Sequence, residues 1–156
     1  MKKLLIYASL FFVFPVMAVN AQSRKSVGAA EVNGTFRSYF SGKYKGSYNE
    51  IKILALGGGK LRVAFQLLYP YTTADGELMA NTGEADGTAT ITGDTAVYAS
   101  DEFGQQCRIT IKFVKRGTIE VTQEGASECG FGLNVSAGGT YKKTNSAKPK
   151  FKRSDF

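Results

Sequence analysis

The sequence contains no histidine and no tryptophan, and it has only two cysteines and three prolines in 156 residues. Without histidine there can be no Ser-His-Asp triad, no Cys-His pair and no histidine-ligated zinc or haem. Two cysteines are too few to hold a metal cluster through four thiolates. We therefore predict a non-enzymatic protein with no cofactor and no bound metal.

The N-terminus has the pattern of a secretory signal peptide. Lys2 and Lys3 precede a mostly apolar run from Leu4 to Val19, and the small-residue motif Val19-Asn20-Ala21 follows. This run is shorter than the ~20 apolar residues that a membrane-spanning helix needs. We predict cleavage after Ala21 and export to the periplasm or the cell exterior, with no transmembrane segment. No cysteine lies near the cut, so we do not expect a lipoprotein.

Positive charge is concentrated at the two ends of the chain, although the formal net charge is +7. The stretch from Val63 to Cys107 has no lysine or arginine at all. Its acidic residues are Asp75, Glu77, Glu84, Asp86, Asp94, Asp101 and Glu102. An uneven distribution of charge along the chain indicates which partners a protein attracts, and it does not indicate the fold. We predict that this acidic segment, 63–107, binds or inhibits a cationic protein. An exported chain is not expected to bind nucleic acid.

Short runs of alternating polarity between glycines predict antiparallel strands. Folding Lys60 to Tyr69 back through three glycines places Ile53 opposite Val63. The three-residue loop after Val114 pairs Cys107 to Phe113 with the strand from Ile119, so that Ile111 faces Val121 and Lys112 faces Glu120.

A third hairpin turns at Gly93-Asp94, and Leu78 to Asn81 reads as a separate strand. Together, these hairpins and strands indicate an all-β fold, a small antiparallel meander barrel of eight or nine strands. A two-sheet sandwich is the alternative.

The predicted organisation places one folded domain between two irregular ends. After the signal peptide (1–21), residues 22–32 are a flexible lead, 33–143 the barrel, and 144–156 a disordered basic tail. The tail is too polar to order itself, and we predict that it touches anionic envelope polymers such as lipopolysaccharide or teichoic acid. We expect a monomer.

The two cysteines are expected to form a structural disulfide. An exported chain favours oxidation, and the hairpin register brings a loop ending at Cys129 back towards Cys107. A reactive thiol pair is disfavoured because there is no Cys-x-x-Cys motif and no histidine to lower a thiol pKa.

Glu84 and Asp86 lie two residues apart and would share one face of a strand. The rise per residue of a strand then places the two carboxylates ~7 Å from each other. This spacing suits an inverting glycosidase, and with Asp75 or Asp101 the pair could form a weak calcium site. A solvated strand end is the favoured interpretation, so glycan hydrolysis is our third hypothesis.

The motifs Gly34-Thr35-Phe36 and Gly139-Thr140-Tyr141 resemble the first and last strands of calycins, the barrel group of lipocalins and avidins. Phe36 stands where those proteins carry Trp, and their second motif is not identifiable. The segment Cys107 to Lys143 also resembles small exported bacterial domains of no assigned activity, and the shape and compartment are similar to those of periplasmic lysozyme inhibitors. The lipocalin resemblance implies a second hypothesis, carriage of a small apolar ligand inside the barrel by Phe65, Tyr69, Phe113 and Phe131.

Overall fold

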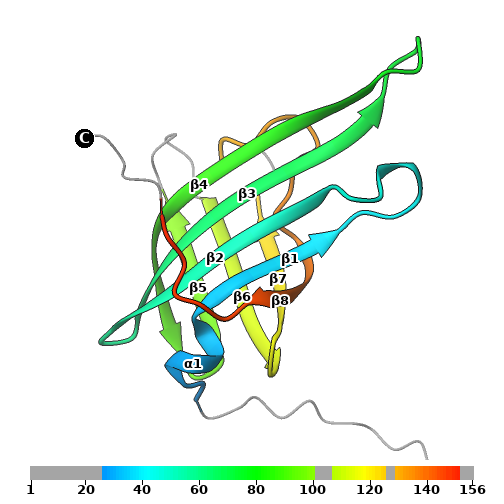
Figure 1. The fold of residues 1–156 in the computed structure, drawn as a ribbon. Coiled ribbons are helices and arrows are strands. Elements are labelled where there is room, and N and C mark those ends of the chain that lie inside the picture. The colour runs from blue at the N-terminus through cyan, green and yellow to red at the C-terminus, as the bar shows by residue number, and fades with distance from the viewer. Residues whose placement is uncertain (1–25, 101–106, 126–128, 152–156) are drawn as a thin grey trace, which may run out of the picture.

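A computed structural model describes residues 26–100, 107–125 and 129–151 of the chain. These residues form a closed antiparallel barrel in which each strand pairs with its neighbour in sequence and the last strand pairs with the first (Figure 1). The sandwich alternative is therefore wrong. The eight strands are β1 (Gly34–Tyr39), β2 (Tyr48–Gly57), β3 (Lys60–Thr72), β4 (Leu78–Thr92), β5 (Thr95–Ser100), β6 (Cys107–Lys115), β7 (Thr118–Glu124) and β8 (Gly139–Asn145).

The predicted hairpin registers are confirmed. Ile53 pairs with Val63 across β2 and β3, and Ile111 pairs with Val121 across β6 and β7. The turn at Gly93-Asp94 joins β4 to β5 as expected. In each hairpin a tight glycine turn and a strict alternation of apolar residues agree on one register, because a slip of one residue would turn every apolar side chain outwards.

Alternate residues of the strands point inward and fill the barrel. Phe36 and Phe113 meet edge to face across the interior, with ring centroids 6.4 Å apart. Tyr141 is fully buried, and its hydroxyl donates to the carbonyl of Ala137 at 2.9 Å. Burial raises the pKa of this phenol well above its ordinary value, while a hydrogen bond with Asn49 opposes the shift. The largest buried side chains are Tyr141, Phe36, Phe65, Phe113, Ile51, Ile53, Leu61, Ile109, Ile111, Ile119 and Val63.

One end of the barrel is covered by the short helix α1 (Ala29–Val32), which lies immediately before β1 (Figure 1). Val32 is buried in the core. Lys143 of β8 donates from Nζ to the carbonyls of Glu31 and Asn33 at 2.6 and 2.8 Å, and so ties the helix to the last strand. Burial lowers the pKa of Lys143, and the charge of Glu31 opposes the shift. The predicted flexible lead therefore contains a helix that packs on the barrel.

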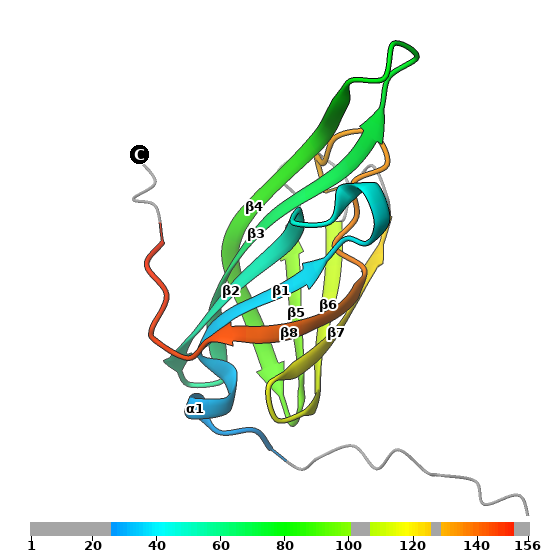
Figure 2. The ribbon, with the colours of Figure 1, turned by 45° about the vertical axis from the view of Figure 1, so that its right-hand side comes forward.

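The C-terminal boundary also differs from the prediction. β8 continues to Asn145, two residues beyond the expected end of the barrel, because it pairs with β1 as far as Thr35. The described part of the tail then runs outside the barrel wall (Figure 2). Its Phe151 is half-buried and lies against the guanidinium of Arg62, 4.6 Å from ring centroid to Cζ. Only residues 152–156 of the tail lie outside the described residues.

Strands β3 and β4 are the longest, and their hairpin projects beyond the rim of the barrel (Figure 2). The separate strand expected at Leu78 to Asn81 is the first part of β4, so the described chain has eight strands rather than nine. Tyr69 lies on this projecting part and is 41% exposed. The expectation that it faces the barrel interior is therefore wrong, because this part of the hairpin lies beyond the rim of the barrel. No helix in the described ranges is long and apolar enough to cross a membrane.

Candidate functional site

The barrel wall is incompletely paired along β4. On one side β4 pairs with β3 from Leu78 to Thr90, over nearly its whole length. On the other side it pairs with β5 only from Ala89 to Thr92. Within the described ranges, no strand pairs with the preceding part of β4 on that side. Between Gly83 and Thr88, β4 thus has no strand partner on that side among the residues that the structure describes, and we call this stretch the β4 edge.

The direction of the backbone groups identifies which residues form this edge. The carbonyl of Thr82 accepts from Gly132 on the side away from β3, at 3.0 Å. Along a strand, alternate residues direct their N–H and C=O groups to the same side. The groups of Glu84 and Asp86 therefore point the same way as those of Thr82. Unlike Thr82, neither residue has a backbone partner on that side among the described residues.

An open cleft of about 820 Å³ surrounds the β4 edge. On its inner side lie the small residues Ala85 and Gly87, with the rings of Phe65 and Tyr98 next to them. These two rings are 5.4 Å apart in an edge-to-face arrangement. Gly87 is required there, since a Cβ would approach the Tyr98 ring to 2.9 Å. The cleft thus has an apolar floor behind a polar backbone edge.

The outer side of the cleft carries the two carboxylates of β4. Asp86 accepts from Nε and Nη2 of Arg62, at 3.3 and 3.2 Å, and both partners are partly exposed. Glu84 is exposed and makes no ion pair with any residue that the structure describes. The opposite position on β3 is the uncharged Gln66. Among the described residues, Glu84 is therefore a carboxylate without an ion-pair partner.

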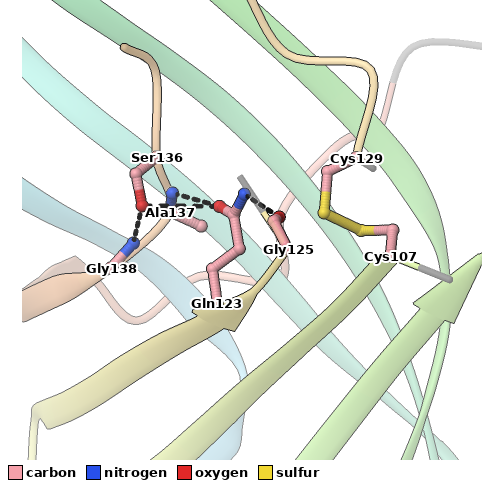
Figure 3. Close-up of a disulfide and its surroundings, with 7 residues drawn as sticks. All are labelled: Cys107, Gln123, Gly125, Cys129, Ser136, Ala137 and Gly138. Carbon is pink, nitrogen blue, oxygen red and sulfur yellow. Dashed lines mark hydrogen bonds between the residues drawn. A yellow bond between two sulfur atoms is a disulfide. The ribbon is translucent and has the colours of Figure 1, made fainter. Parts of the chain in front are cut away.

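The disulfide fixes the segment that closes one end of this edge (Figure 3). The predicted Cys107–Cys129 bond is confirmed, with Cα atoms 4.6 Å apart. The bond joins the start of β6 to the loop at this end of the β4 edge. In this loop Phe131 packs on Gly83, and the N–H of Gly132 donates to the carbonyl of Thr82.

A glutamine anchors the same loop further along (Figure 3). Gln123 donates from Nε2 to the carbonyl of Gly125 at 3.0 Å, and its Oε1 accepts from the N–H of Ala137 at 2.8 Å. The loop is held by a covalent bond at one end and by an amide side chain at the other. Its position at the β4 edge is therefore determined by the fold.

The acidic residues predicted to form one surface are dispersed. Glu84 and Asp86 lie together on the outer face of β4, whereas Asp75 and Glu77 lie at the tip of the projecting hairpin. Asp94 is buried in the turn at the other end of β4, where its carboxylate accepts from the hydroxyl of Thr95 at 2.9 Å. It is therefore not available as a surface group. Asp101 and Glu102 lie outside the described residues.

The four residues predicted to line an internal ligand site do not line one cavity. Phe65 and Phe113 are core side chains, Phe131 covers Gly83, and Tyr69 is exposed beyond the rim. Of the four, only Phe65 lines the large cleft. In residues 26–100, 107–125 and 129–151, no three cysteine or acidic side chains gather as a metal site would require.

The pattern of the sequence does not indicate the β4 edge or the contact of Phe151 with Arg62. It does predict that Glu84 and Asp86 share one strand face, and they do. The only sequence signal for the edge is the run of small residues at alternate positions of β4, Gly83, Ala85, Gly87 and Ala89. Comparisons of the chain with protein-family models, with curated proteins and with solved structures gave no match.

Proposed function

We propose that this is an exported, non-enzymatic binding protein that takes a cationic protein at the outer face of β4, around Glu84 and Asp86. The observation that carries the proposal is that Glu84 has no ion-pair partner among the described residues and lies beside an open cleft. The segment 63–107 supplies no lysine or arginine, and among the described residues Arg62 is the one base that forms an ion pair with either carboxylate. Charges of one sign on a protein surface speed its association with partners of the opposite sign and disfavour partners of the same sign.

The proposed binding surface is smaller than the acidic segment 63–107 that the sequence suggested, because it contains only Glu84 and Asp86 of that segment's acidic residues. The five acidic residues of this segment that the structure describes are spread over β4 and its turns. They cannot act as one patch, since a strand of this length spans ~50 Å at the usual rise per residue. Two carboxylates beside a cleft can still contact one basic segment. The shape remains similar to that of lipocalins, and we infer membership of no family from it because fold does not determine function.

Binding to basic proteins immobilised on a surface tests the proposal. We expect retention of the protein at low ionic strength and weaker retention at the physiological ~0.15 M, where the Debye length falls to ~8 Å. The double variant E84Q/D86N should lose most of the binding. The matched control is E120Q/E124Q, which removes the same charge from exposed positions of β7. If the two double variants bind alike, net charge alone explains retention and the site on β4 is refuted.

A second candidate function is binding of a small apolar ligand in the cleft, instead of in the barrel interior. Its volume of about 820 Å³ lies in the usual range of ligand sites, and Phe65 and Tyr98 supply an aromatic floor. Native mass spectrometry of freshly purified protein separates the two candidates, because a co-purified apolar molecule is expected only for the second. Glycan hydrolysis by Glu84 and Asp86 stays the third hypothesis, and it fails if E84Q/D86N leaves the action of the protein on cell-wall polysaccharides unchanged.

A further inference from the structure

We infer that the C-terminal segment 146–151, which we call the strap, occupies the cleft beside Glu84 and Asp86 in the free protein, and that a cationic partner binds there by displacing it. This inference rests on the proposed function and adds to it the regulation of the same site. It depends on the path of the strap, on the contact that Phe151 makes and on the charge of the segment.

The strap leaves the barrel at a turn and then follows the outside of the wall (Figure 2). At the end of β8, Oδ1 of Asn145 accepts from the backbone N–H two residues further on at 2.8 Å, as in an Asx turn. Beyond this turn Pro149 and Phe151 are half-buried, whereas Lys148 and Lys150 are exposed. Side chains of an extended segment alternate between its two sides. The strap therefore lies with its apolar side on the wall and its lysines in solvent.

Phe151 brings the strap to the proposed binding site. Its ring lies over the guanidinium of Arg62, 4.6 Å from ring centroid to Cζ, and it lines the same cleft as Glu84 and Asp86. Arg62 in turn donates from Nε and Nη2 to Asp86. The ring, the guanidinium and the carboxylate thus form one connected group. A partner that approaches Asp86 within the cleft therefore meets the ring of Phe151.

The strap carries the same sign of charge as the proposed partner. It contains Lys148 and Lys150, and the chain continues with Lys152 and Arg153. Among the described residues, neither lysine of the strap forms an ion pair and Glu84 has none either. The attraction between the strap and the carboxylates therefore acts through solvent and is screened by salt. A cationic partner competes with the strap for the same carboxylates.

The strap is held weakly enough for a partner to displace it. Its sequence is too polar to order itself, so its position depends on the wall. Its aromatic contact is a cation–π interaction at a partly exposed site, which shifts an equilibrium by only ~2- to 5-fold. A site that is covered for part of the time binds its partner with an affinity reduced by that fraction. The strap should therefore lower the affinity of the cleft without closing it.

Replacement of Phe151 in the full-length protein tests the competition. The variant F151A removes the ring without a change of charge, and it should bind immobilised basic protein ~3-fold or more tightly than the native protein does. The matched control is S146A, which alters an exposed residue of the same strap and should bind as the native protein does. Because Phe151 lies outside the barrel, both variants should keep the native Tm.

A fluorescent variant observes the displacement directly. The sequence contains no tryptophan, so F151W introduces a single indole at the cleft. Addition of poly-L-lysine at constant ionic strength should shift its emission to longer wavelength and increase its quenching by acrylamide, because the ring moves into solvent. Poly-L-lysine has no aromatic group and repels the basic strap, so it acts through the carboxylates. The change should be smaller in F151W/E84Q.

The outcomes distinguish this inference from the proposed function. Equal binding by F151A and the native protein, with binding still lost in E84Q/D86N, would overturn displacement and leave the proposed function intact. Weaker binding by F151A would show that the strap belongs to the binding surface, which also contradicts displacement. Equal binding by the native protein, E84Q/D86N and E120Q/E124Q would refute the proposed function itself. Tighter binding by F151A, together with the red shift of F151W, supports both.

Discussion

Removal of the disulfide is expected to destabilise the barrel strongly and to loosen the loop at the β4 edge. The cross-link joins residues with a sequence separation of 22, for which the chain-entropy model predicts ~3 kcal/mol. Both cysteines are buried, with 2% and 3% exposure. Their replacement by alanine leaves two small voids, each worth ~1 kcal/mol. The double variant C107A/C129A should therefore lose ~4–5 kcal/mol.

Urea unfolding of three samples separates these contributions. The oxidised protein is the reference, the reduced protein retains its sulfur atoms and should lose only the ~3 kcal/mol of the cross-link, and C107A/C129A should lose more. Hydrogen exchange at Gly132, whose N–H is bound to Thr82, should accelerate in both altered samples. A loss below ~1 kcal/mol on reduction would show that Gln123 and the packing of Phe131 hold the loop without the bond, and would refute this reasoning.

Three further predictions concern the core, the loop and the tail. Because burial holds the pKa of Tyr141 above its ordinary value, the native state keeps this proton when the unfolded state begins to lose it near pH 10. The stability from this residue is complete below pH 10 and falls by up to ~1.4 kcal/mol per pH unit above it. Y141F should be less stable at pH 8, since it loses the bond to Ala137, and this deficit should shrink at pH 11 in urea unfolding; a constant deficit would contradict the shift. G132A should cost ~1–3 kcal/mol, because its Cβ would lie 2.7 Å from the carbonyl of Thr82. Its control G138A, whose Cβ would make only ordinary contacts at 3.4 Å or more, should change stability by less than ~0.5 kcal/mol in the same assay, and equal effects would refute the clash. Truncation after Ala147 should shift Tm by less than ~2 °C, since Phe151 is only half-buried. It should also abolish retention on anionic polymers such as lipopolysaccharide, whereas unchanged retention would refute a binding role for the tail.

Local features of the chain determined most of the barrel. The β6–β7 hairpin could be predicted with its register because its turn glycine, its alternation and its charge pairs all lie within one short segment. The disulfide followed from the same register, combined with the expectation of export. In such hairpins every residue finds its partner within a few positions of the turn, so no knowledge of the remaining fold is needed.

The candidate site depended on strands that are distant from one another. The alternation of β3 predicted an inward Tyr69, but the strand outruns the barrel wall at that point. Asp94 looked like a surface charge, but the turn that contains it packs against β6, where Phe113 donates to its carbonyl. Both errors arise because burial depends on which elements lie opposite, and the alternation within one strand does not contain that information.

The sequence by itself determined the all-β class, the hairpin registers and the pairing of the cysteines, because these follow from neighbouring residues and short turns. Only the tertiary structure decided that, among the described residues, the pairing of β4 with β5 stops at Ala89, short of Glu84 and Asp86. The length over which β4 and β5 stay together depends on how the whole barrel closes, through the strand β8 that meets β1 and the loop that reaches Thr82. The way a barrel closes depends on the positions of all its strands together, and the extent of the β4–β5 pairing depends on that closure.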